Sequence, residues 1–463
     1  APDDDPANPD GWIVIVAIAD VAFHVRPGTA LDEEALKRGN SVYFPDRVVP
    51  MLPERISNDL CSLREGEDRP CLAVRMRFDK AGRKIGHDFL RGLMRSAAKL
   101  AYAQAQAAID GQPDDSTGPL LDTVLRPLWD AYGALKRARD SRGPLELDIP
   151  ERKIVLDTAG RVADVVVPER LDAHKLIEEF MIQANVAAAE TLERKRAPLI
   201  YRVHDAPSKE KIAALGDFLS TLDIKLPKAG VLKPEQFNKI LAQTRDRDIG
   251  ELVSEVVLRA QAQAEYTPAN LGHFGLNLRR YAHFTSPIRR YADLIVHRSL
   301  IRALELGSDG LSDPEIPQLD EIASAISDTE RRAMSAERET VDRLIAGHLA
   351  DQIGATFAAR ISGVTRTGLF VRLATTGADG FVPGSSIGDD FFRHDERLQA
   401  LVGERTGLAF RLGDRVEARL VEAIPSAGAL RFELLSEGRP LPPGTRRSRE
   451  GRRPGRRPRR GRR

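Results

Sequence analysis

Two consecutive arginines follow a proline in the stretch TSPIRRYADLIVHR, residues 285–298. Ser286 is a favourable N-cap residue and proline suits the first helical position, so the sequence predicts a helix that begins here with one buried face. Arg289 and Arg290 then lie in the first turn, beside the positive end of the helix dipole, where cations are disfavoured. A bound anion would resolve the conflict, because free backbone N–H groups and arginine forks together bind phosphate. The alternative is that both arginines are solvated or paired with carboxylates.

The composition is that of a soluble chain with a large core. The 463 residues are 42% hydrophobic and 30% charged, and the length suits two or three domains. No apolar run approaches the roughly 20 residues of a membrane span, and no signal peptide is recognised. Cys61 and Cys71 are too few for a disulfide framework or a zinc site. A cytoplasmic location without a membrane partner is therefore expected.

Charge is distributed unevenly along the chain. The net charge is +2, but residues 439–463 contain twelve Arg and one Glu, so this segment is +11 and the remainder is −9. Such a composition predicts a disordered basic tail, at residues 438–463, that binds a polyanion such as nucleic acid. The alternative is a tail that only aids solubility.

Residues 1–350 show mixed strand and helix patterns. Alternation of apolar and polar residues around turn signals predicts hairpins, whereas apolar residues at helical spacing predict helices. The predicted elements are a buried strand at 12–19, hairpins at 71–90 and 152–167, and helices at 172–196 and 318–349.

Residues 351–437 change character. About five short β segments separated by Gly-rich turns predict a small barrel of OB type, which can bind single strands through aromatic stacking and basic side chains. For any single aromatic residue, Phe370 included, a place in the barrel core is the alternative. The candidate RNA-binding residues are Phe370, Phe381, Phe391, Phe392 and His394, with Arg366, Arg372 and Arg393 nearby.

Several long segments, in order, resemble the catalytic domain of the ribonuclease II / ribonuclease R family. They are VAIADVAFHVRPGTALDEEALKRGNSVYFPDRVVPMLPERISNDLCSL, DAHKLIEEFMIQAN, IYRVHDAPS and HFGLNLRRYAHFTSPIRRYADLIVHR. The barrel resembles the RNA-binding domain named after ribosomal protein S-one, and the Arg-rich end brings the chain closest to the bacterial ribonuclease R type. The resemblance implies a mixed α/β catalytic domain at 1–350, an OB fold at 351–437 and the basic tail.

The resemblance also implies an activity. Members of this family are processive exoribonucleases that hydrolyse single-stranded RNA from its 3′ end to nucleoside 5′-monophosphates with Mg²⁺, in RNA turnover, and a monomer is expected here. By match to the family motifs, Arg289 would hold the reacting phosphate, Tyr43 would stack on a base and Glu337 would contact the terminal ribose. Arg290 is expected to bind RNA beside Arg289. A second stacking aromatic of the family is replaced here by Leu147.

The metal ligands form the main departure from the family pattern. The family carries closely spaced aspartates, of the type D-x-x-x-x-x-D-F-D-D, just before the VAIAD strand, and such oxygen ligands suit Mg²⁺. This chain begins APDDDPANPDGW, and Asp3, Asp4 and Asp5 are interpreted as a solvated loop. No metal ligand is therefore assigned within residues 1–463, and the Mg²⁺ ligands are expected upstream of residue 1. A catalytically inactive RNA-binding fragment is the alternative function.

Overall fold

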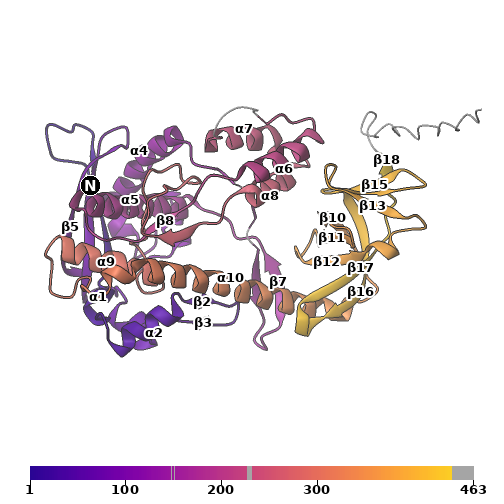
Figure 1. Cartoon of the computed structure of the whole chain (residues 1–463). Coiled ribbons are helices and arrows are strands. Elements are labelled where there is room, and N and C mark those ends of the chain that lie inside the picture. Colours follow the sequence, from indigo (N-terminus) through magenta and orange to yellow (C-terminus); the bar gives the residue numbers. More distant parts are fainter. Residues whose placement is uncertain (148, 151, 227–231, 441–463) are drawn as a thin grey trace, which may run out of the picture. The chain divides into compact units, whose positions relative to one another are not determined.

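The structure, a computed structural model, describes residues 1–147, 149–150, 152–226 and 232–440 (Figure 1). The chain divides into two compact units, the first comprising Ala1–His348 and the second beginning at Leu349. The basic tail predicted at 438–463 lies almost wholly outside the described residues, since only its first three residues fall within them. No helix in the described ranges combines the length and the apolar character needed to cross a membrane.

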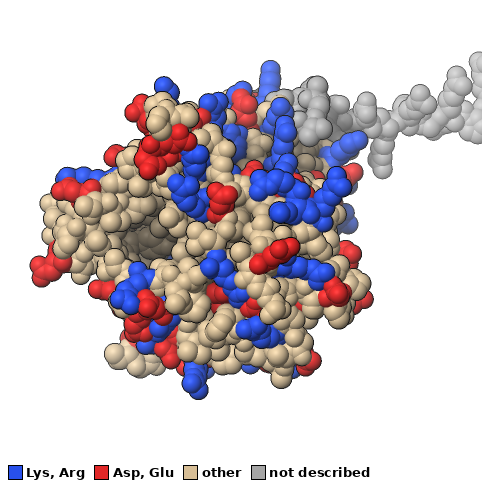
Figure 2. All heavy atoms as spheres, turned by 90° about the vertical axis from the view of Figure 1, so that its left-hand side faces the viewer, with Lys and Arg blue, Asp and Glu red and all other residues tan. Residues whose placement is uncertain are grey.

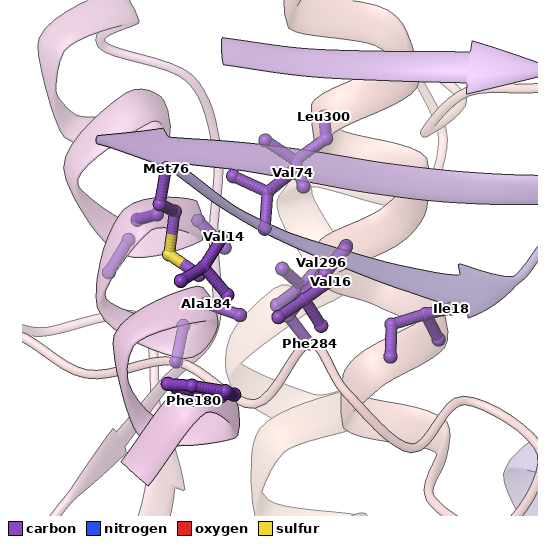
Figure 3. Close-up of a cluster of buried hydrophobic side chains, with 14 of the residues drawn as sticks. Val14, Val16, Ile18, Val74, Met76, Phe180, Ala184, Phe284, Val296 and Leu300 are labelled. Carbon is purple, nitrogen blue, oxygen red and sulfur yellow. The ribbon is translucent and has the colours of Figure 1, made fainter. Parts of the chain in front are cut away.

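The first unit contains an antiparallel three-stranded sheet of order β1-β4-β5, formed by Trp12–Ala19, Asp68–Phe78 and Lys84–Arg95. Successive side chains of a strand point to opposite faces of the sheet, and the apolar residues at every second position form one apolar face. Val14 and Val16 of β1 and Val74 and Met76 of β4 point from that face into the core (Figure 3). They pack against α5 (Asp172–Lys195) and α9 (Tyr291–Ala303), which carry Phe180, Ala184, Val296 and Leu300.

The strand predicted at 12–19, both predicted hairpins and both long helices are confirmed, although the strand is buried along one face only, since Ile15 is 60% exposed. Their exact bounds and those of the other elements follow from the structure. The helices are α1 (Val21–His24), α2 (Ala30–Arg38), α3 (Tyr102–Ile109), α4 (Arg126–Arg142), α6 (Lys209–Ser220), α7 (Pro234–Thr244), α8 (Gly250–Ala260) and α10 (Leu319–Leu349). Three two-stranded sheets pair β2 (Val42–Tyr43) with β3 (Val48–Val49), β6 (Lys153–Leu156) with β7 (Val162–Val166), and β8 (Tyr201–Val203) with β9 (Glu265–Thr267).

The second unit is built on the predicted five-stranded barrel, which closes in the order β10-β11-β12-β17-β16. Its strands are Thr356–Val364, Gly368–Leu373, Asp379–Pro383, Ala429–Leu434 and Arg415–Ile424 in that order. A four-stranded sheet, which the sequence did not predict, is inserted between β12 and β16 and completed after β17. It consists of β13 (Phe392–Asp395), β14 (Ala400–Gly403), β15 (Leu408–Arg411) and β18 (Arg439–Pro440).

The helix predicted to begin at Ser286 begins instead at Tyr291, so this prediction was wrong. Residues 287–289 form a turn, and the backbone at Arg290 is extended because it pairs with Asn40. A pairing with a segment 250 residues away therefore overrides the local Ser-Pro signal. Helix α9 is also buried around its whole circumference from Tyr291 to Ile301, rather than along one face.

Candidate functional site

One pocket of the first unit brings together residues from distant parts of the sequence. Its walls come from the segment after α2, the turn before α9, strand β9 and one face of α10, which lies along β2 and β3 (Figure 1). Tyr43, Arg289, Arg290 and Glu337, selected from the sequence, all line it. The remaining lining residues are Gly39, Asn40, Ser41, Tyr266, Ala292, Ile326, Glu330, Ala333 and Met334.

The wall at residues 39–43 is held by backbone contacts on both sides. Gly39 ends α2 with a φ of 70°, and a Cβ there would lie 1.9 Å from the hydroxyl of Thr329 on α10, so only glycine fits. The Ser41 N–H donates to the Arg289 carbonyl (3.0 Å), while the Tyr291 N–H donates to the Gly39 carbonyl (2.9 Å). This wall and the arginine turn are therefore positioned by one another.

Tyr43 and Glu337 are joined directly. The Tyr43 backbone N–H donates to Glu337 Oε1 at 2.7 Å, across 294 residues of sequence. The Tyr43 side chain remains 50% exposed, so its ring has a free area against which a flat group can pack. Only one carboxylate oxygen of Glu337 is used in this bond, which leaves Oε2 to accept a bond from a ligand hydroxyl.

The two arginines of the turn have different surroundings. Arg290 forms a two-bond ion pair with Asp293, from Nε at 2.7 Å and Nη2 at 2.9 Å, and Asp293 Oδ1 also accepts from the Ser286 N–H at 2.7 Å. The Asp293 side chain is fully buried and that of Arg290 is 17% exposed. For Arg290 the ion-pair alternative is therefore correct, and its fork is largely occupied.

Arg289 is exposed, and the hydrogen bond found for its guanidinium among the described residues is one of 3.3 Å from Nη2 to Ser286 Oγ. Most of its donors are therefore open to a ligand. Because α9 begins after it, the helix dipole does not act on Arg289 as the sequence argument required. The case for an anion here rests instead on an open guanidinium fork, which matches a phosphate in two-bond geometry.

The floor of the pocket is a packed polar network. Arg202 donates to Glu330 Oε2 at 2.6 Å, and its guanidinium lies over the Tyr266 ring, 4.7 Å from the centroid. The Tyr266 hydroxyl is hydrogen-bonded to His283 Nδ1 at 2.9 Å. Burial lowers the pKa of His283 well below its usual range and raises the pKa of Tyr266, so both side chains are neutral at pH 7. Glu330 is thus fixed in place by a charged partner.

The described residues offer no cluster of three or more His, Cys, Asp or Glu side chains that could hold a metal ion. Asp3 is not solvated, as the sequence interpretation had it, because its side chain is 1% exposed and accepts from Asn8 (2.8 Å) and Arg77 (2.9 Å). Asp5 also binds Arg77, at 2.5 Å. Hydrogen bonding by Asn8, ahead of that by Arg77, lowers the pKa of Asp3. These residues therefore do not fit a Mg²⁺ site.

The second unit presents two of the predicted aromatics to solvent. Phe370 is 41% exposed and lies opposite Phe381 on β12, with the ring centroids 5.3 Å apart. Phe391 is 72% exposed, whereas Phe392 is half-buried against Phe410. Phe370 and Phe391 therefore do not lie in the core of the barrel, which was the alternative for each of them.

The arginines expected beside these aromatics are engaged in ion pairs. Arg372 pairs with Asp379 at 2.9 Å and Arg366 with Glu396 at 3.0 Å. The Arg366–Glu396 pair is largely exposed and hence contributes little to stability, whereas the side chain of Arg372 is only 26% exposed.

Charges of both signs are interleaved over the face shown in Figure 2, which is hollowed at one place where the lining is mostly uncharged. This pattern agrees with the net charge of −9 outside the tail, and it differs from the continuous basic surface of many duplex-binding proteins. On this face, a polyanion would be attracted by individual arginines and lysines rather than by one continuous basic surface.

Several residues of the pocket could not be found from the sequence. Tyr266, Glu330 and Met334 lie outside any recognisable motif. The spacing of four residues places Glu330 and Met334 on one face of α10, but only the folded structure brings Tyr266 of β9 beside them. Leu147, which stands at the position of the family's second stacking aromatic, is half-buried and does not line the pocket.

Comparison with known proteins gives consistent matches. A family model described as "RNB domain" matches residues 5–306, and one described as "S1 RNA binding domain" matches residues 350–433. Ribonuclease R of Escherichia coli K12 is 40% identical over 439 residues, which cover 93% of this chain and 54% of that protein. Ribonuclease R of Aquifex aeolicus is 41% identical over 432 residues, covering 93% and 61%.

Solved structures agree. The apo form of Mycoplasma genitalium RNase R superposes with a TM-score of 0.87 at 31% identity, covering 91% of this chain and 67% of that one. The same values hold for that protein in complex with ribose-methylated single-stranded RNA. The chain spans between about half and three-fifths of the length of the two curated relatives described.

Proposed function

Because the chain belongs to the RNB-domain family of ribonucleases, we propose that it acts within a processive 3′-to-5′ exoribonuclease. The substrate is single-stranded RNA, which is hydrolysed to nucleoside 5′-monophosphates in RNA turnover and quality control. Residues 1–350 form the catalytic domain and residues 351–437 the RNA-binding domain. The observation that carries the proposal is the convergence of Tyr43, Arg289 and Glu337 on one pocket.

Each of these side chains suits one part of a nucleotide. The half-exposed ring of Tyr43 stacks on a base, which is sequence-tolerant because every base has a π face. The open fork of Arg289 binds a phosphate, and Oε2 of Glu337 accepts a hydrogen bond from a ribose hydroxyl. A ligand that offers a base, a phosphate and a ribose hydroxyl together is a ribonucleotide, and we propose that the pocket receives the one at the 3′ end of the strand.

Mg²⁺ is proposed as the metal, with ligands other than the carboxylates that the structure describes. Within the described part of the chain no carboxylate cluster fits it, so the residues seen here bind and orient the RNA end rather than activate water. Arg289 is the catalytic residue among them, since it contacts the reacting phosphate.

The second unit carries RNA-binding residues of its own. The exposed rings of Phe370 and Phe391 provide stacking contacts for the strand, and Arg372, which lies on the same β-strand as Phe370, provides a phosphate contact. Arg290 contributes at the pocket through its structural pair with Asp293. A monomeric state and a cytoplasmic location are also proposed, on the sequence alone.

The proposal is tested by comparing linear RNA with circular RNA of the same sequence. We expect the 463-residue chain to bind the linear form about tenfold more tightly, in fluorescence anisotropy at a salt concentration that weakens binding through the arginine-rich residues 439–463. In the same solutions with Mg²⁺ we expect no release of mononucleotides. Equal affinity for the circle would contradict end recognition, and chelator-sensitive mononucleotide release would contradict the placement of the metal ligands.

A further inference from the structure

We infer that Met334 forms the second wall of the base site, so that a base at the RNA 3′ end lies between the Tyr43 ring and the Met334 thioether. The inference rests on the proposed function of the pocket and deepens it by assigning a residue that contacts the base.

Met334 is exposed where a buried or charged residue would be expected. Its side chain is 57% exposed, and it is the one large apolar side chain exposed on α10 in the described structure. The other exposed positions of this helix are charged, polar or small, which is the usual pattern of a solvated helix face. An isolated exposed apolar residue needs no explanation by itself, but this one opens into a pocket.

The remaining apolar residues that line the pocket belong to its walls. Ala292, Ile326 and Ala333 are 2–6% exposed and Tyr266 is 7% exposed. Among the described lining residues, only Tyr43 and Met334 are large apolar side chains with about half of their surface free. A base that enters the pocket therefore meets its apolar contacts at these two residues.

The two side chains come from different elements that are tied together at this point. Glu337 lies three residues after Met334, on the same face of α10, and accepts the Tyr43 N–H at 2.7 Å. Glu330 lies four residues before Met334 on that face and is fixed by Arg202. Met334 is thus flanked by two anchored carboxylates, one of which joins its helix to the strand that carries Tyr43.

The chemistry of the thioether fits a site that must accept every base. Methionine is unbranched, flexible and polarizable, and it packs favourably against ring systems without hydrogen-bonding groups that select one base. A purine and a pyrimidine can therefore be held in turn as the strand shortens. An aromatic side chain at this position would be a stiffer wall.

The test uses single-stranded RNA with 2-aminopurine at the 3′-terminal position, in the presence of a chelator, with the 463-residue chain. Met334→Ala is expected to weaken binding about two- to tenfold and to raise the fluorescence of the bound probe, because one stacking partner is lost. Met334→Leu is expected to remain within twofold. Leu258→Ala, at a 48% exposed position of α8 outside the pocket, is the matched control and should change neither reading.

The outcomes separate the inference from the proposed function. If Tyr43→Ala weakens binding and raises the fluorescence but Met334→Ala does neither, Met334 does not contact the base, although the pocket is still the site of the RNA end. If Tyr43→Ala changes neither the affinity nor the fluorescence of the terminal probe, the pocket itself is not the RNA-end site. A probe placed in the interior of the strand should respond to none of the Met334 variants, and an equal response there would also overturn the inference.

Discussion

Arg289→Lys is expected to slow single-turnover cleavage of RNA by roughly a hundred- to a thousand-fold, in a version of the chain to which the aspartate run typical of the family has been added. Lysine keeps the charge but loses the planar fork, and the structure shows that most donors of this fork are open to a phosphate. An interaction made mainly in the transition state affects the rate rather than the affinity. RNA binding is spread over the pocket and the barrel, so the affinity should change little.

The comparison requires single-turnover rates and equilibrium binding for the variant and a control. Arg290→Lys is unsuitable as a control, because the Arg290 fork holds buried Asp293 and its loss would disturb the turn. Arg338→Lys is suitable, since Arg338 is exposed on α10 and does not line the pocket. Cleavage by the Arg289 variant at close to the parent rate would show that the phosphate role is wrong.

Asp293→Ala is expected to lower the free energy of unfolding of the first unit by about 3–5 kcal/mol. Asp293 is fully buried, and its removal leaves the charge of Arg290 without its partner and the Ser286 N–H without an acceptor. Urea unfolding followed by circular dichroism measures the effect. The turn that presents Arg289 depends on these bonds, so the variant should also bind RNA ends weakly.

Asp328→Ala is the matched control for this substitution. Asp328 and Arg331 form an Asp–Arg pair with the same three-residue spacing, but their side chains are 68% and 43% exposed. An exposed pair of this kind contributes below about 1 kcal/mol. Equal destabilisation by the two variants would mean that burial does not explain the importance of Asp293.

Local patterns in the sequence were sufficient for most of the fold. The hairpin of β4 and β5 and the barrel strands alternate apolar and polar residues around turns, and α5 and α10 are long and periodic. The short strands of the inserted sheet, four residues or fewer each, lack such a signal.

The errors arose where distant segments meet. Ser286 and Pro287 give a strong helix-start signal, but the backbone of the next residues pairs with residues 39–41 and delays the helix to Tyr291. Asp3 lies in a sequence typical of a solvated loop and is nevertheless buried against Arg77. Neither contact is visible in the local sequence.

The site itself was recognisable only in part. Arg289 was identified from its own motif, whereas Tyr43 and Glu337 were selected through a family resemblance, since they are 294 residues apart. Met334 follows from neither route, because an exposed methionine on a charged helix has meaning only once the opposite wall of the pocket is known.

The most direct measurement is photocrosslinking of RNA that carries 4-thiouridine at its 3′-terminal position, followed by identification of the crosslinked peptides. The account predicts crosslinks to the pocket, at residues 39–43 and on α10 around Met334 and Glu337, that disappear when the same RNA is circularised. Moving the 4-thiouridine to the 5′ end should abolish these crosslinks. Crosslinks from the 3′ end that fall only in the second unit, or that persist with the circle, would contradict the claim that this pocket receives the end of the strand.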